Sequence, residues 1–306
     1  MCARFVGSFD IFAAGRAAGR CERDTGFSDY ILGLLWTKYG EFMPNPPRGH
    51  PDKAQAYFFL CFKFIKHAPR PSHVTATMWT PHTGCISTGT YRRQIEPRLL
   101  ILGMLIDEIH WSDRLSPFNH TVHFPGGAVG LLDSLPLVIS TPSDWRAASK
   151  YFQGKYNNYV LKVQIIIDFN GNIVWCSLPH LGTRSDPKMW EAWHPHFNAG
   201  EYVLADGAYI SCSHCLVPYQ APANQVLTQD QDWLNAVIQL YRARVEQIIS
   251  NVKNFELWRS KCRSGGEVTV AMAKICIHAT ALQLREQSEY KWRYQSTMPD
   301  LPRPHF

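Results

Sequence analysis

The longest amphipathic pattern in the chain lies between Trp233 and Lys253, where apolar residues recur at steps of three and four. This spacing predicts an α-helix with one apolar stripe that faces a core. The stripe consists of Leu234, Val237, Ile238, Tyr241, Val245, Ile248, Ile249 and Val252. At about 100° per residue, Glu246 falls on the flank of the stripe, with Arg242 and Lys253 beside it. A carboxylate between two cations at the edge of a core suggests an active site.

Helical spacing also dominates the first third of the chain. It predicts helices over 30–39 and 54–67, and two more over 86–109 that are broken near Pro97. We therefore expect a poorly structured N-terminus over 1–27 and an α-helical region over 28–122.

The arginines of this region leave two interpretations open. They predict a basic face made of Arg70, Arg92, Arg93 and Arg98. Such a face could belong to a helix-turn-helix that meets DNA, or it could be the solvated surface of a packing subdomain.

From His123 the hydrophobic period changes from that of a helix to that of strands. Residues 129–139 alternate so that Asp133 shares a strand face with leucines. Three more strands are predicted over 159–168, 172–178 and 201–206. The pair Asn170-Gly171 predicts a two-residue hairpin turn, and two helices are expected over 187–193 and 269–284. The order predicts an α/β domain over 123–286, followed by a disordered proline-rich tail over 287–306.

Composition narrows the class of protein. The 306 residues are 45% hydrophobic, and the net charge of +6 is compatible with a polyanionic partner. Nine scattered cysteines fit a reducing compartment. No apolar run is long enough to span a membrane, so we expect no membrane partner. Residues 1–23 do not form a secretory signal; a transit peptide and an unstructured terminus both stay open.

Three acids occupy special places in this pattern. Asp133 lies within a strand, Asp206 ends a strand and Glu246 lies on a helix flank. An acid among buried leucines needs compensation by a metal or by hydrogen bonds. Carboxylates that converge favour Mg²⁺, and a pair of such ions can cleave a phosphodiester while Arg242 and Lys253 hold its phosphates. Taken singly, each acid also fits a structural role, and Arg242 with Glu246 fits a simple ion pair one helical turn apart.

Other candidate sites are weaker. A lone Cys212-Ser-His-Cys215 motif favours ordinary thiols over zinc, because no second pair accompanies it. Trp190 and Trp193 could stack on bases, but their spacing is more typical of a core. No complete ligand set surrounds the remaining metal candidates, which are His120, His123, His180, His194 and His196.

From about Gly127 to Leu282 the chain resembles the nuclease domain of PIF/Harbinger-type DDE transposases. The resemblance rests on five blocks in order, which are Val129 to Ser134, Tyr156 to Asp168 with Gly171, Gly182 to Asp186, Leu204 to Tyr209, and Arg242 to Glu246 with Lys253 downstream. The run Glu108 to Trp111 resembles the segment that precedes this nuclease. After Asp133 many relatives have Gly-Thr, whereas Ser134-Leu135 stand here.

The resemblance implies an RNase H-like fold, with a mixed five-stranded sheet flanked by helices and a small N-terminal α-helical subdomain. It implies Asp133, Asp206 and Glu246 as catalytic and metal-binding acids, Asp186 as a further metal ligand, and two Mg²⁺ or Mn²⁺ ions. It also implies DNA cleavage and strand transfer, action in the nucleus, and a separate Myb-like DNA-binding partner. Symmetric cleavage of two DNA ends would favour a homodimer. The alternative is a catalytically inactive, domesticated DNA-binding or scaffold protein on the same fold.

Overall fold

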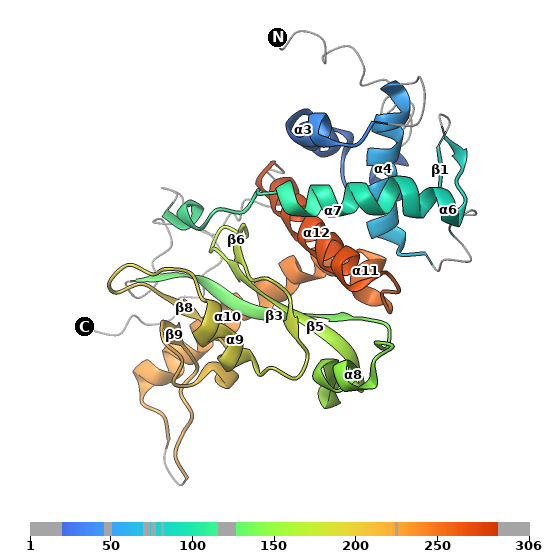
Figure 1. Ribbon diagram of the computed structural model, residues 1–306. Coiled ribbons are helices and arrows are strands. Elements are labelled where there is room, and N and C mark those ends of the chain that lie inside the picture. The colour runs from blue at the N-terminus through green and yellow to red at the C-terminus, as the bar shows by residue number, and fades with distance from the viewer. Residues whose placement is uncertain are drawn as a thin grey trace. The chain divides into compact units, whose positions relative to one another are not determined.

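A computed structural model describes residues 20–45, 51–69, 74, 78–80, 83–115, 127–223 and 226–286 (Figure 1). The chain divides into two compact units, each built from several segments. Unit 1 combines residues 1–108, 137–145 and 251–283, and unit 2 combines 109–136, 146–250 and 284–306. The domains predicted from the sequence are each one continuous range of residues, whereas both units combine separate ranges. The expected tail over 287–306 lies outside the described residues.

Unit 1 is mainly helical. Its elements are α2 (Arg20–Thr25), α3 (Asp29–Tyr39), η1 (Gly40–Phe42), α4 (Pro51–His67), β1 (Trp79–Thr80), β2 (Gly84–Cys85), α6 (Thr88–Thr90), η3 (Tyr91–Ile95), α7 (Glu96–Leu105), α11 (Glu256–Arg259) and α12 (Gly266–Glu286). Phe27 lies at the centre of its aromatic core, where it stacks on Phe255 and meets Phe62 edge to face. The helices predicted over 30–39 and 54–67 are confirmed as α3 and α4.

The expected break near Pro97 is absent, because α6, η3 and α7 follow one another without a gap. Pro97 lies in the first turn of α7, where a residue without an N–H is tolerated. Immediately before it the helix widens to a π-type turn, in which the N–H of Glu96 donates to the carbonyl of Tyr91. The widened turn therefore carries the chain past the proline.

Arg98 does not belong to a basic surface. Its side chain is fully buried, donates to the carbonyls of Gln94 and Pro44, and lies over the ring of Tyr57. Arg92 and Arg93 are exposed, and Arg70 lies outside the described residues. The predicted four-arginine face is therefore wrong at Arg98.

Unit 2 contains a mixed sheet with strands in the order β4-β5-β3-β8-β9, and β6 and β7 also pair with β5. The strands are β3 (Ala128–Val138), β4 (Phe152–Gln153), β5 (Asn158–Ile167), β6 (Ile173–Cys176), β7 (His180–Leu181), β8 (Tyr202–Leu204) and β9 (Cys215–Leu216). The predicted count of five was too low, because three of the seven strands are two residues long and give no period. β8 pairs in parallel with β3 and β9, whereas β5 pairs antiparallel with β4, β6 and β7.

The hairpin between β5 and β6 is confirmed, but its loop is longer than two residues. The N–H of Asp168 donates to the carbonyl of Asn172, which leaves three residues between them. The Asp168 carboxylate accepts from the backbone of Asn170 and Asn172, and Gly171 adopts a positive φ of 85°. The carboxylate thus closes the turn, a contact that a turn dipeptide alone does not encode.

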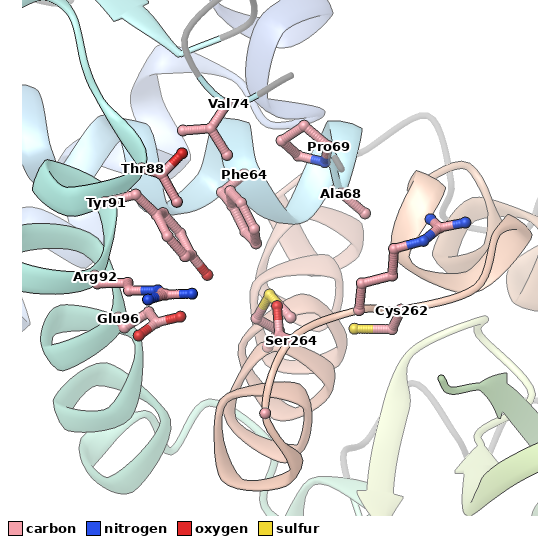
Figure 2. A pocket seen from close by; sticks show the side chains of 13 residues that line it. Phe64, Ala68, Pro69, Val74, Thr88, Tyr91, Arg92, Glu96, Cys262 and Ser264 are labelled. Carbon is pink, nitrogen blue, oxygen red and sulfur yellow. The ribbon is translucent and has the colours of Figure 1, made fainter. Parts of the chain in front are cut away.

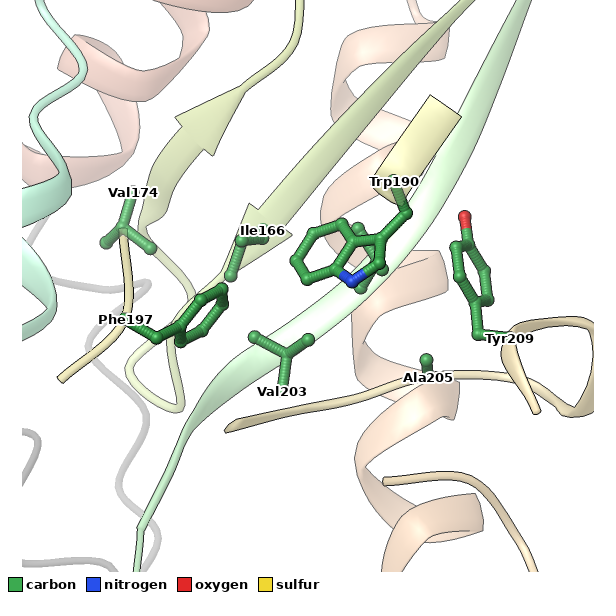
Figure 3. Close-up of a cluster of buried hydrophobic side chains, with 8 residues drawn as sticks. Ile166, Val174, Trp190, Phe197, Val203, Ala205 and Tyr209 are labelled. Carbon is green, nitrogen blue, oxygen red and sulfur yellow. The ribbon is translucent and has the colours of Figure 1, made fainter. Parts of the chain in front are cut away.

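One face of the sheet packs against α9 (Asp186–Trp193). A cluster of buried side chains surrounds Trp190, as Figure 3 shows, and it includes Leu132 of β3, Ile166 of β5 and Val203 of β8. Trp190 is fully buried, but Trp193 is 57% exposed, so the expected core role holds only for the first tryptophan.

α10 (Gln229–Lys253) confirms the predicted amphipathic helix and begins four residues earlier. Of the predicted stripe, all residues from Val237 on are buried and Leu234 is partly exposed. Its Tyr241 ring lies 5.0 Å from that of Phe169 at the end of β5. The remaining helical turns are η4 (Trp111–Leu115), α8 (Trp145–Tyr151), η6 (Gly154–Tyr156) and η7 (Gly207–Tyr209). Within the described ranges, no helix has the length and apolar character needed to cross a membrane.

Candidate metal-dependent active site

Asp133 lies within β3, and Asp206 follows the end of the neighbouring strand β8. β3 and β8 run parallel with Leu131 opposite Leu204, and each aspartate follows its leucine by two residues. Neighbouring strands are about 4.8 Å apart, so this register directs both acids to the same end of the strand pair. Strand β8 is shorter than predicted, which places Asp206 just beyond its end.

Both aspartates point to the same face of the sheet. Leu132 and Ala205, which precede them, belong to the cluster around Trp190. Because side chains alternate along an extended chain, Asp133 and Asp206 point to the opposite face. Both carboxylates are partly exposed, in keeping with a role towards a ligand.

Backbone groups fix the orientation of both acids. The N–H of Ser134 donates to Oδ1 of Asp133 at 2.7 Å. The N–H of Ala208 donates to Oδ1 of Asp206 at 2.9 Å, so Asp206 caps the short helix η7. These bonds hold two oxygen donors in place, which is the ligand type that Mg²⁺ prefers.

Glu246 lies on the solvent-exposed side of α10 rather than at the edge of the core. Arg242 and Lys253 on the same helix are exposed as well. Within the described part of the chain, no ion pair joins Arg242 to Glu246, so the simple helical pair considered from the sequence is not formed. A carboxylate and two cations are therefore available to ligands.

The three acids do not form a closed ligand set. In the residues that the structure describes, no three His, Cys, Asp or Glu side chains are grouped so that they could hold a metal. Asp133 and Asp206 alone still fit one Mg²⁺, which is commonly held by one or two carboxylates together with substrate phosphates and water. Among the described residues, Cys212, Cys215, His180, His194 and His196 belong to no group of three possible metal ligands. His120 and His123 lie outside the described residues.

Asp186, at the start of α9, is engaged in an ion pair. Its Oδ1 lies 2.8 Å from Nζ of Lys162, whose side chain is only 4% exposed. Lys162 also donates to the carbonyl of Arg184. Lys162 and Ile166 share a face of β5 by alternation, so Asp186 meets this strand on the Trp190 side of the sheet.

Tyr209 connects the surroundings of Asp186 and Asp133. Its hydroxyl lies 3.0 Å from Oγ of Ser134 and accepts from Nε2 of Gln164 at 2.8 Å. The same Gln164 amide donates to the backbone carbonyl of Asp186 at 3.0 Å. Burial raises the pKa of Tyr209, and the charges of Asp186 and Asp133 raise it further. The hydrogen bonds to Ser134 and Gln164 lower this pKa but do not cancel the increase. The hydroxyl stays protonated and joins the two acid-bearing segments.

Lys162, Gln164 and Tyr209 were not among the functional residues predicted from the sequence. A signal was present, because Lys162 and Gln164 are polar residues at alternate positions of a strand that is otherwise apolar. Buried polar side chains of this kind require partners. Here the partners are Asp186 and Tyr209, both within blocks that carried the family resemblance.

Residues 132–282 match the sequence model of a family described as DDE superfamily endonuclease. This segment contains Asp133, Asp186, Asp206 and Glu246 as well as Tyr209. The mixed sheet flanked by helices is compatible with such a nuclease. No curated protein and no solved structure matches the chain.

Proposed function

We propose that the segment 132–282 is a metal-dependent DNA endonuclease of the transposase type. The observation that supports the proposal is the parallel pairing of β3, which contains Asp133, with β8, which Asp206 follows, inside the segment that matches the endonuclease family. Paired carboxylates in this position supply the oxygen ligands that phosphodiester cleavage by divalent ions requires.

In this proposal the sheet is RNase H-like and the enzyme is of the PIF/Harbinger type. Asp133 and Asp206 hold a first Mg²⁺ or Mn²⁺, and Glu246 completes a second site. When bound, such ions activate a water molecule and stabilise the leaving oxygen of the phosphodiester. The chain's own contribution is to fix the two aspartates through Ser134 and Ala208.

Arg242 and Lys253 bind the DNA backbone on either side of Glu246. Both are exposed cations, and neither forms an ion pair within the described chain, so both are available for phosphate oxygens. Asp186 supports the site through Lys162 and Gln164, and it would act as a metal ligand only after exchanging its ion pair. Strand transfer by the released 3′-hydroxyl, action in the nucleus, a Myb-like partner and a homodimer belong to the same proposal.

The test is a nicking assay on supercoiled DNA with Mg²⁺, with Mn²⁺ and with a chelator. We expect nicking only with metal, and we expect Asp133→Asn and Glu246→Gln to abolish it while DNA binding is retained. Glu256→Gln serves as the matched control for a carboxylate outside the site. Nicking at the wild-type level by either active-site variant would overturn the proposal.

A second function is favoured by the absence of a three-acid group among the described residues. In that case the chain is a catalytically inactive, domesticated DNA-binding or scaffold protein. Metal-independent DNA binding that is lost on replacing Arg242 and Lys253, without nicking under any metal condition, would favour this alternative.

A further inference from the structure

Unit 1 contains a pocket that the endonuclease proposal does not use. Its volume is ≈ 150 Å³, and it lies between η3 and the N-terminus of α12, with the end of α4 beside it (Figure 2). Phe64, Val74 and Met272 supply apolar lining, whereas Tyr91, Arg92, Glu96 and Ser264 supply polar lining. An apolar floor with a few convergent polar groups is typical of a ligand site.

The hydroxyl of Tyr91 is buried and aimed into this pocket. The residue is only 6% exposed, and its oxygen has no hydrogen-bond partner among the described residues. Figure 2 shows the hydroxyl pointing away from the Phe64 backbone towards the space beside Ser264. Burial raises the pKa of Tyr91, and the neighbouring Ser264 side chain, which does not meet hydrogen-bond geometry with this oxygen, lowers it in part, so the group is a protonated donor. A buried donor without a partner is costly, which indicates that a ligand completes it.

The N-terminus of α12 provides further donors at the same place. This helix is 21 residues long and begins at Gly266, directly after Ser264 and Gly265 of the lining. The first N–H groups of a helix have no partner within the helix and carry partial positive charge. Open space surrounds the position of a Cβ at both Gly265 and Gly266, so a ligand can approach the backbone closely.

The charge of the lining favours an anion. Arg92 is exposed and forms no ion pair in the described chain, and Figure 2 shows its guanidinium on the side of the pocket opposite Ser264. Arg263 also lines the pocket, but its guanidinium donates to the carbonyl of Lys261 at 3.1 Å, so we assign it no role. Glu96 is the single acid of the lining and weakens the attraction for an anion.

We propose that this pocket binds the phosphate group of a phosphate ester, held by the Arg92 guanidinium, the Tyr91 hydroxyl and the first N–H groups of α12. A phosphate offers several oxygens in a compact volume, which matches donors converging from three directions. A smaller halide would leave some of these donors without a partner. The site is independent of Asp133 and its neighbours, and its ester could be a mononucleotide or the DNA backbone.

The experiment is a calorimetric titration of the full chain with inorganic phosphate in the presence of a chelator, which keeps metal-bound sites out of the signal. We expect saturable binding that Arg92→Gln weakens about tenfold and Tyr91→Phe weakens about threefold. Removing the repulsion with Glu96→Gln should tighten binding. Arg93→Gln is the matched control, because Arg93 is an exposed neighbour that does not line the pocket, and it should change affinity less than twofold.

Two competitors identify the source of the phosphate. Displacement by deoxycytidine monophosphate alone assigns a phosphomonoester, and displacement by a single-stranded oligonucleotide without terminal phosphates assigns the DNA backbone. Equal effects of Arg92→Gln and Arg93→Gln, or phosphate binding that neither ester displaces, would overturn the proposal. Asp133→Asn should leave phosphate binding unchanged, so failure here is distinct from failure of the endonuclease proposal.

Discussion

The hydroxyl of Tyr209 lies 3.0 Å from Oγ of Ser134, the residue that follows Asp133. Tyr209 itself follows Asp206 by three residues, and its N–H donates to the Asp206 carbonyl. The side chain therefore joins the two segments that carry the paired aspartates. Its second bond, to Gln164, extends this connection to the segment of Asp186.

Replacing Tyr209 with phenylalanine should loosen this connection. The change removes one of the two hydrogen bonds that the buried Gln164 amide donates and takes away the Tyr209 partner of the Ser134 hydroxyl, at a cost of about 1–3 kcal/mol in the free energy of unfolding. Urea denaturation measures this loss, and we expect the nicking rate to fall with it. Tyr219→Phe is the control, since Tyr219 is 45% exposed. Equal stability of the two variants would contradict the structural role of Tyr209.

Lys162 and Asp186 should behave as a coupled pair. Lys162→Met leaves the Asp186 carboxylate next to a buried strand without its cation, and we expect a loss of about 1–3 kcal/mol, because Asp186 is partly exposed. The double variant Lys162→Met with Asp186→Asn should recover part of that loss, which a double-mutant cycle measures. Strictly additive effects would show that the ion pair does not stabilise the loop.

Gly182 should be intolerant of a side chain. A Cβ at this position would collide with the carbonyl oxygens of Tyr151 and Val160, so Gly182→Ala must displace the loop that leads to Asp186. We expect a loss of about 1–3 kcal/mol in thermal or urea unfolding. Gly154→Ala is the control, because nothing lies within 4 Å of its added Cβ. Equal losses of stability in Gly182→Ala and Gly154→Ala would show that the close backbone contacts at Gly182 do not exclude a side chain.

Glu201 should contribute stability that is lost in acid. Burial alone would raise its pKa, but hydrogen bonds from Asn198 and Arg114 outweigh burial and hold the pKa below its usual value. A lowered pKa in the folded state gives stability above the unfolded value of about 4.3, and this stability disappears as pH falls through the folded pKa. Glu201→Gln should be less stable at neutral pH and should lose less stability between about pH 5 and 3. Glu41→Gln, at an exposed position, should keep the wild-type pH profile.

Much of the fold could be predicted because long periodic segments carry their own signal. The stripe of α10 and the alternation of β3 both matched the structure within a few residues. Short strands could not be found in this way, since β4, β7 and β9 have two residues each and depend on their partners. The burial of Arg98 was equally hidden, because its acceptors are backbone carbonyls and the ring that it covers is distant in sequence.

The candidate site was predictable in part for a similar reason. The sequence pattern predicted that Asp133 lies within a strand and Asp206 at a strand end, whereas the parallel pairing of β3 with β8 depends on contacts between segments far apart in the chain. The exposure of Glu246 was not expected, because helical angle alone does not tell how far a core extends around a helix. The ion pair of Asp186 depends on Lys162, which lies 24 residues earlier and is recognised only when the strand and loop are placed together.

The most direct test of the central claim is to locate Mn²⁺ in crystals of the protein by anomalous scattering, with and without a short DNA duplex. We predict a Mn²⁺ ion about 2.0–2.3 Å from carboxylate oxygens of both Asp133 and Asp206, and with DNA a second ion at Glu246. Binding should disappear at both positions in Asp133→Asn crystals. If crystals with saturating Mn²⁺ and DNA show no ion at Asp133 and Asp206, the proposed metal site is contradicted.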